Sequence, residues 1–180
     1  MKKIAYVLMV VVLLFAIMGA SNKTSKAGKS SSELVYKSAI KKGFKVKWVV
    51  TGEKVNFIIS APCKGWVAIG FKPSFMMKDA NFIMGYVDNK GKVFVSDEFG
   101  VGPTRHTPDI ELGGKNNIVK YSGKQNDTTT EISFTIPLNS LDKYDTVLKP
   151  NEKVYIILAC SDSDDFTTKH KERTELIIEL

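Results

Sequence analysis

Alternation between apolar and polar side chains constrains the fold of this chain more than any other feature of its sequence. From residue 34 onward, short runs rich in Val, Ile, Phe and Tyr are separated by turn sequences such as TGE, DNKG and KPNE. In the run 130–136, Ile132, Phe134 and Ile136 share one face and polar residues occupy the other. This period of two is typical of strands with one buried face, and no helical period competes with it beyond residue 33.

The runs number about ten and recur at regular spacing, a pattern typical of antiparallel sandwiches. We therefore expect an all-β fold, an antiparallel β-sandwich. The two longest stretches without strand character are 100–114 and 161–173, and loops of that length in a compact domain are usually functional or disordered. The expected strands are 34–40, 44–50, 54–60, 65–71, 81–87, 92–99, 117–123, 130–136, 154–160 and 174–180.

The first 33 residues differ from the rest in composition. Two lysines precede an apolar run that ends in small residues at Ala20, which is the layout of a secretory signal peptide. We expect a signal peptide at 1–20, a flexible linker at 21–33 and one domain at 34–180. A retained membrane anchor is the alternative, because the apolar run is close to the minimum length of a membrane span. Either way the chain is expected to be exported across the cytoplasmic membrane, to the periplasm, the exterior or the membrane surface.

The net charge of +7 does not indicate a nucleic-acid partner. Five lysines and no acid lie in residues 1–30, so the remaining 21 basic and 19 acidic residues leave a net charge of only +2. The domain is thus nearly balanced, and the basic tail is most simply a solvated linker. Weak attraction of this tail to anionic lipid leaves proximity to a membrane open.

Two cysteines, Cys63 and Cys160, are present in a chain expected to reach an oxidising compartment. A disulfide between them would close a long loop and contribute about 4 kcal/mol of stability. The other interpretation is a pair of small buried thiols in neighbouring strands. There is no CxxC or CxxCH, so a zinc ribbon and a covalently attached haem are disfavoured.

A methionine-rich turn and a late histidine offer metal-ligand chemistry. The only histidines, His106 and His170, lie in the two long loops, and His170 directly precedes the last strand, which could fix its ring. Met76 and Met77 stand in a turn where polar residues are expected. A soft thioether and an imidazole together suit a haem iron with both axial positions filled, which favours electron transfer.

Catalytic motifs are missing from the sequence. We find no GxSxG and no HExxH, and the acidic stretch 162–165 lacks the glycine and glutamate of an EF-hand loop. An enzyme is therefore not expected.

Several motifs taken together resemble a DOMON domain. They are GWVAIGF at 65–71, MKDAN at 77–81, KVFVSDEF at 92–99 and SDSDDFTTKHKER at 161–173. Within that family the chain is similar to the haem-binding subgroup, which includes the cytochrome domain of cellobiose dehydrogenase. The resemblance covers residues 34–180 and implies a β-sandwich.

The resemblance also implies a non-covalent haem b held by a methionine and a histidine. The positions that match are Met77 and His170, whereas Met76 is one residue out of register. Trp66 matches the aromatic residue of the GW strand, as core packing or as a haem contact, and Asn81 replaces the usual acid. Some related subunits use lysine as the ligand, and both neighbours of His170 are lysines.

Secondary roles follow for other residues near these positions. Arg173, and after it Arg105, would pair with haem propionates, because a guanidinium matches a carboxylate. Phe75, Phe82 and Met84 are candidates for apolar walls.

The function that we expect is an exported b-type haem domain that exchanges electrons with a separate redox partner protein. The rival is a haem-free DOMON module that binds a carbohydrate or another small ligand, with Met77 only packing. A third interpretation is a subunit that stabilises a larger redox complex.

Overall fold

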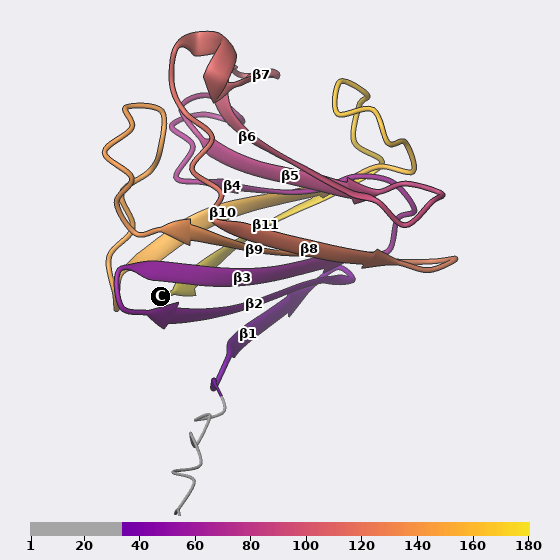
Figure 1. Ribbon diagram of the computed structural model, residues 1–180, viewed down its shortest axis with the longest axis horizontal. Coiled ribbons are helices and arrows are strands. Elements are labelled where there is room, and N and C mark those ends of the chain that lie inside the picture. The colour runs from indigo at the N-terminus through magenta and orange to yellow at the C-terminus, as the bar shows by residue number, and fades with distance from the viewer. Residues whose placement is uncertain (1–33) are drawn as a thin grey trace, which may run out of the picture. The chain divides into compact units, whose positions relative to one another are not determined.

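The computed structural model describes residues 34–180, which form an all-β domain with two stacked antiparallel sheets (Figure 1). One sheet has five strands in the order β1-β2-β3-β9-β8, and the other has six in the order β11-β10-β4-β5-β6-β7. The predicted sandwich is thereby confirmed. The predicted signal peptide at 1–20 and linker at 21–33 lie outside the described residues.

Each of the ten predicted runs overlaps an observed strand, and one further strand was missed. The missed strand, β7, is a four-residue edge strand that pairs irregularly with β6, and it leads into a short 3-10 helix, η1. Its sequence RHTP has no apolar alternation, since no face of it enters the core. The strands are β1 (Lys37–Lys41), β2 (Phe44–Thr51), β3 (Lys54–Ala61), β4 (Val67–Phe71), β5 (Asn81–Val87), β6 (Val93–Gly102), β7 (Arg105–Pro108), β8 (Lys120–Gln125), β9 (Thr130–Pro137), β10 (Lys153–Cys160) and β11 (Glu172–Glu179), and η1 is Asp109–Leu112.

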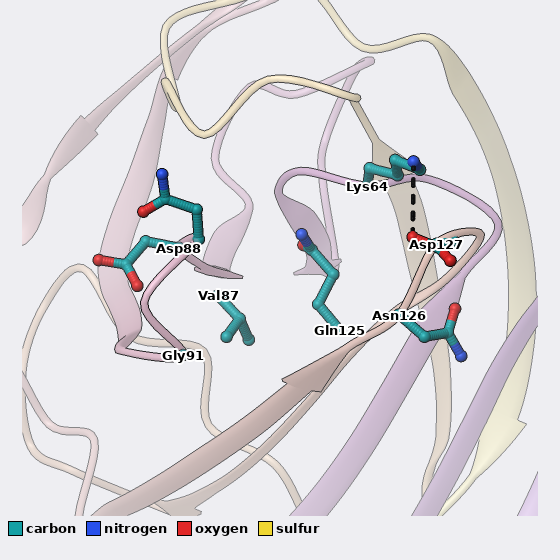
Figure 2. A pocket seen from close by; sticks show the side chains of 8 residues that line it. Lys64, Val87, Asp88, Gly91, Gln125, Asn126 and Asp127 are labelled. Atoms are coloured by element: carbon teal, nitrogen blue, oxygen red, sulfur yellow. Dashed lines mark ion pairs between the residues drawn. The ribbon is translucent and has the colours of Figure 1, made fainter.

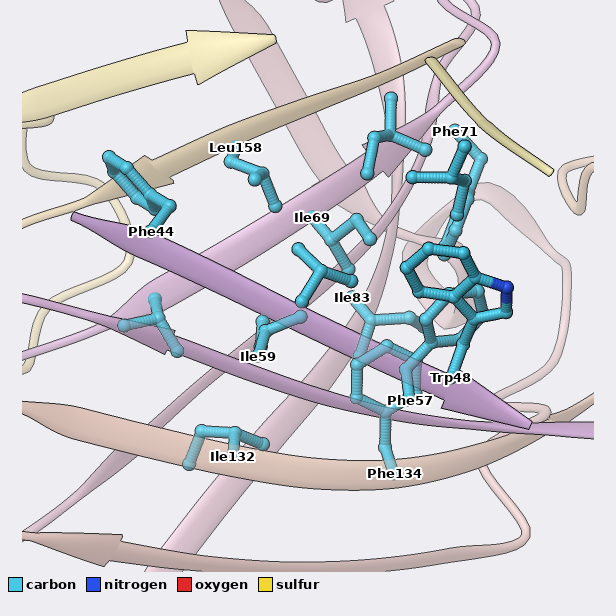
Figure 3. Close-up of a cluster of buried hydrophobic side chains, with 14 of the residues drawn as sticks. Phe44, Trp48, Phe57, Ile59, Ile69, Phe71, Ile83, Ile132, Phe134 and Leu158 are labelled. Carbon is cyan, nitrogen blue, oxygen red and sulfur yellow. The ribbon is translucent and has the colours of Figure 1, made fainter. Parts of the chain in front are cut away.

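The main core lies between the two sheets and is built on aromatic contacts (Figure 3). Phe57 and Phe134 are opposite one another in the β3–β9 pair, with ring centroids 5.6 Å apart. Phe71 reaches them from the other sheet, 5.2 Å from the ring of Phe57. All three are completely buried, so the alternation seen in the sequence assigns the inner faces correctly. Within residues 34–180, no helix has the length and hydropathy needed to cross a membrane.

Cys63 and Cys160 form a disulfide, which decides between the two interpretations of the cysteines. Both residues are buried, their Cα atoms are 6.1 Å apart, and the bond spans 97 positions of sequence. It joins the segment before β4 to the last residue of β10. The stretch 161–171 therefore starts from a covalently fixed point.

Candidate functional site

A second apolar cluster lies on the outer face of the six-stranded sheet. Ile69 and Ile83 point into the core between the sheets, so their neighbours along β4 and β5 must point away from it. These outward residues, with Trp66 before β4 and Ala80 before β5, form a buried group at most 5 % exposed. We call this group the outer cluster; it consists of Trp66, Ala68, Ala80, Phe82 and Met84.

The floor of the outer cluster is made of small residues. Ala159 of β10 lies beside Ala68 of β4 in register, and the next outward position along β4 is Gly70. A Cβ at Gly70 would come within 2.5 Å of the Phe82 ring, so this ring can lie over β4 only because Gly70 has no side chain. The sheet thus offers a flat apolar surface with Phe82 and Met84 beside it.

Two loops border this surface from opposite ends. Phe71, at the end of β4, pairs with Ile156, whereas Val67, at its start, pairs with Cys160 at the end of β10. The turn 72–80, which follows β4, and the loop 161–171, which follows β10, therefore lie at opposite ends of the face. In Figure 1 the loop 161–171 is the yellow segment that rises above the six-stranded sheet. Met77 of the turn and Phe166 of the loop both pack against the outer cluster.

Glycines allow both loops to approach the sheet closely. A Cβ at Gly100 would overlap the carbonyl oxygen of Met77, and a Cβ at Gly65 would overlap the backbone of Ser163. Main-chain hydrogen bonds form at both of these close contacts: Asp79 N–H donates to Gly100 O at 2.8 Å, and Trp66 N–H donates to Ser163 O at 3.0 Å. The positions of the turn and the loop are therefore fixed by main-chain contacts that larger residues would prevent.

Trp66 holds the loop 161–171 in place. Its indole Nε1–H donates to the Thr168 hydroxyl at 3.1 Å, and its side chain is 3 % exposed. At the far end of the loop, Lys171 N–H donates to Cys160 O at 2.7 Å. Trp66 accordingly packs in the outer cluster, as one of the two sequence interpretations expected. His170 lies between the anchored residues Thr168 and Lys171.

The two adjacent methionines have different environments. Met77 is partly buried against the outer cluster, whereas Met76 is 46 % exposed and has a positive φ of 55°. The turn places one thioether on the apolar surface and the other in solvent. Met77 therefore contacts the outer cluster, and its role as a ligand stays a prediction.

His170 is partly buried in the loop 161–171, two residues after Thr168, whose hydroxyl accepts a hydrogen bond from Trp66. Burial lowers the pKa of its imidazole, and the nearby charges of Arg173 and Lys169 lower it further. A neutral imidazole is the form that binds a metal. Arg173 is exposed and lies opposite Ala159 in register, so it extends from the outer face close to His170.

The remaining sequence candidates divide into two groups. Phe82 and Met84 belong to the outer cluster, as expected for apolar walls. Phe75 does not, since it is 63 % exposed, and Arg105 is exposed at the start of β7.

Sequence reasoning named His106 but missed its pairing with Glu98 on the same face of the sheet. His106 Nδ1 is hydrogen-bonded to the carboxylate of Glu98, and its ring centroid lies 6.0 Å from that of Phe82. Glu98 is 3 % exposed and stands opposite Phe82 in register. The sequence signal that could have indicated this pair is Glu98 at an outward position of its strand, with His106 eight residues later. The irregular β6–β7 pairing that joins them has no signature in the sequence.

Two surface hollows lie elsewhere, and neither is lined by Met77 or His170. The first, of about 340 Å³, is surrounded by polar turn residues, including Lys64, whose ammonium is 4.0 Å from the Asp127 carboxylate (Figure 2). The second, of about 440 Å³, lies over the five-stranded sheet and includes Tyr36 and Tyr121. The first offers no aromatic surface, whereas the second offers two phenol rings.

The residues around the outer cluster fit a haem. A flat apolar surface suits a macrocycle, the Met77 thioether packs against it, and the loop that carries His170 lies at its other end. Arg173 supplies an exposed cation close to the imidazole. The turn 72–80 and the loop 161–171 already cover the outer cluster, because its members are at most 5 % exposed.

Comparisons with known proteins agree with the observed fold. The sequence matches the DOMON domain family over residues 40–161, a range that includes Trp66 and Met77 but not His170. Among solved structures, the fold is similar to that of the cytochrome domain of Myriococcum thermophilum cellobiose dehydrogenase. The TM-score is 0.55, the sequence identity is 10%, and the match covers 80% of each chain. At that identity the likeness shows a shared fold.

Proposed function

This chain belongs to the DOMON domain family, and from that premise we propose that it is an exported b-type haem-binding domain that acts in electron transfer. The observation that carries the proposal is the outer cluster, an apolar group on the outer face of the sheet with Met77 at one border and the His170 loop at the other. A haem bound there would supply the one-electron chemistry of its iron.

The axial ligands in this proposal are the Met77 thioether and the His170 imidazole. Neither donor carries a charge, so both can be held on an apolar surface at little cost in desolvation. His106 is the second candidate for the histidine, although its Nδ1 is already engaged by Glu98. Arg173 would pair with a propionate at the exposed edge.

Haem uptake would require the turn 72–80 and the loop 161–171 to separate. Phe82 and Met84 are 5 % and 3 % exposed, so no apolar surface is open to a macrocycle while both loops are in place. The disulfide at Cys160 and the Trp66–Thr168 hydrogen bond hold the base of the second loop. We therefore expect movement mainly in the part that carries Phe166.

The physiological role follows from the same chemistry. With both axial positions filled, the iron has no open position for a substrate, so the proposed role is electron transfer and not catalysis. Electrons would be exchanged with a separate redox partner protein of unknown identity. Export, through the segment 1–20, is part of the proposal.

The test is an absorption spectrum of the purified protein supplied with haem. We expect one haem per chain, with a Soret band and sharp ferrous α and β bands. Met77→Ala is compared with Met76→Ala, and His170→Ala with His106→Ala, so that each candidate has a matched control. The first member of each pair should lose the low-spin spectrum, and the second should keep it.

Other outcomes would contradict parts of the proposal. No haem uptake by the fully folded protein excludes the function. A spectrum that is lost in His106→Ala and retained in His170→Ala moves the histidine ligand to β7. Identical spectra in all four variants would mean that haem binds without these ligands.

One observation favours the rival function, a haem-free module for a carbohydrate or similar ligand. The hollow of about 440 Å³ on the five-stranded sheet contains Tyr36 and Tyr121, which offer aromatic contacts suited to a sugar. Calorimetric titration with oligosaccharides separates the two functions, since binding lost in Tyr121→Ala and unaffected by Met77→Ala supports the rival.

A further inference from the structure

Three carboxyl groups, two of them buried and one partly buried, meet beside the six-stranded sheet, away from the outer cluster. Asp97 lies in β6, Asp109 begins η1, and Asp145 belongs to the long segment between β9 and β10. Each can place one carboxylate oxygen so that all three oxygens lie within 4.8 Å of one another. We call Asp97, Asp109 and Asp145 the acidic cluster.

Several oxygen atoms at this place have no hydrogen-bond partner. Both carboxylate oxygens of Asp109, which is completely buried, are unpartnered, and so is Oδ1 of Asp97. The Oδ1 atom of Asn81, a residue 3 % exposed, is also unpartnered, although its amide nitrogen donates to Asp145 Oδ1 at 2.5 Å. An unpartnered buried acceptor is costly. Asn81 is not an acid, so its orphaned oxygen points to a ligand independently of the acidic residues.

No cationic side chain compensates the acidic cluster. Among residues 34–180, none of the ion pairs involves Asp97, Asp109 or Asp145. Burial is the main cause that raises the pKa of Asp97 to about 8 and that of Asp109 to about 7, and neighbouring carboxylates raise both further. A cation from outside the chain would therefore meet no competing cationic side chain among the described residues.

The carboxylates are held in position by amide donors. Asn117 N–H donates to Asp97 Oδ2 at 2.8 Å, and the Asn117 side-chain amide donates to Asp145 Oδ2, also at 2.8 Å. These bonds leave Asp97 Oδ1, both Asp109 oxygens and Asn81 Oδ1 directed to no protein donor. The free acceptors thus come from three different segments of the chain.

We propose that the acidic cluster and Asn81 bind one calcium ion. Calcium takes carboxylate and amide oxygens at about 2.3–2.6 Å, so two of its ligands lie up to roughly 5 Å apart, as the spacing here allows. Because carboxylate and amide oxygens are hard donors, this site should not prefer soft metal ions. The short helix η1 and the segment between β9 and β10 supply two of the carboxylates, and such a mixed set suits the variable geometry of calcium better than the strict octahedron of magnesium.

The calcium ion would brace the start of β5. Asn81 follows Ala80, whose N–H donates to Met77 O at 3.2 Å and closes the methionine turn. The ion would therefore hold together β5, β6, η1 and the segment before β10. The proposal does not depend on haem, since every ligand lies on the opposite face of the sheet.

Thermal unfolding of the purified protein, without added haem, tests the site. After treatment with a chelator, saturating calcium chloride should raise the Tm by roughly 5–10 °C, as binding about 100-fold above Kd requires. Isothermal calorimetry should count one calcium ion per chain. Asp109→Asn, which keeps the side-chain volume, should abolish both signals. Asp127→Asn, at an exposed turn residue, is the matched control and should leave both unchanged.

Results of three kinds would overturn the proposal. One is no calcium-dependent shift in the unmodified protein at millimolar calcium. Another is the same shift in Asp109→Asn and in Asp145→Asn, a second variant at a less buried position that guards against misfolding of the first. An equal shift with magnesium chloride would overturn the assignment to calcium. If the three carboxyl groups only share protons and bind no ion, Asp109→Asn should raise the Tm by the same amount with and without calcium.

Discussion

Strand β5 contributes to the outer cluster on one face and contacts the acidic cluster through Asn81 on the other, and the two clusters are chemically opposite. Phe82 and Met84 face outward onto an apolar surface bordered by uncharged donors, whereas Asn81 faces inward toward three carboxyl groups. An uncharged thioether can be held on an apolar surface at little cost, but buried carboxylates need protons or a cation. A single strand can thus serve two different binding chemistries, because successive side chains leave it in opposite directions.

The disulfide gives the largest test of whether the two regions are independent. Replacing Cys63 and Cys160 together by alanine removes a crosslink across 97 positions, and we expect a loss of about 4 kcal/mol in unfolding free energy. The bond anchors the His170 loop at the end of the sheet far from Asn81. The double alanine variant should therefore lose more haem binding than calcium binding. Denaturant unfolding measures the loss, and reduced native protein is the control. An unchanged midpoint would show that the crosslink contributes nothing.

The pH dependence of stability should come mainly from the acidic cluster in the calcium-free protein. The pKa values of Asp97 and Asp109, about 8 and about 7, lie above the 3.8 of the unfolded chain, so the folded state retains protons that the unfolded state releases. Stability should be highest below the unfolded value and should fall as the pH rises toward 8. The slope is about 1.4 kcal/mol per pH unit for each retained proton.

Chemical unfolding at several pH values, with chelator present, measures this slope. Asp109→Asn removes one of the two groups and should flatten the decline, whereas Met77→Ala should leave it unchanged. A stability that is constant between about pH 5 and 8 would contradict the raised pKa values.

Gly100→Ala should damage the outer site selectively. The new Cβ would overlap the Met77 carbonyl oxygen, which is backbone and cannot rotate away. Overpacking of this kind costs about 1–3 kcal/mol, and here it should also displace the Met77 thioether. The spectrum with haem and the unfolding free energy are measured together. Gly102→Ala, where the added Cβ meets nothing within 4 Å, is the control. Equal behaviour of the two variants would mean that the turn does not depend on this contact.

Lys72→Met is the reference variant, because the Lys72 ammonium binds Glu152 and the Val147 carbonyl oxygen and no residue of either cluster. Lys72 pairs with Glu152 at 2.7 Å with both side chains partly exposed, so the pair should contribute less than about 1 kcal/mol. Lys72 lowers the pKa of Glu152, and its contribution is therefore present near neutral pH and lost on acidification. Urea unfolding at neutral pH and at low pH should show a small difference only at neutral pH. A change in haem or calcium binding would show that the effects described above are not local.

Much of the fold could be predicted from local sequence, and the family resemblance named Met77 as a candidate donor. Alternation is a property of neighbouring residues, so it identified the ten long strands and the inward residues of the run 130–136. The interval from Met77 to Ala80, which belongs to the family resemblance, is also local, and the structure gives Met77 and Met76 different environments. Whether Met77 and His170 hold an iron remains a prediction.

Only the tertiary structure could decide the features that depend on distant segments. The Cys63–Cys160 pairing, the contact of His106 with Glu98 and the meeting of Asp97, Asp109 and Asp145 all require the order of strands and the path of the connecting segments. A period of two says which face a residue occupies, but not which other strand lies beside it. That choice is made by the packing of the two sheets, since burying both inner faces in one core fixes which segments meet.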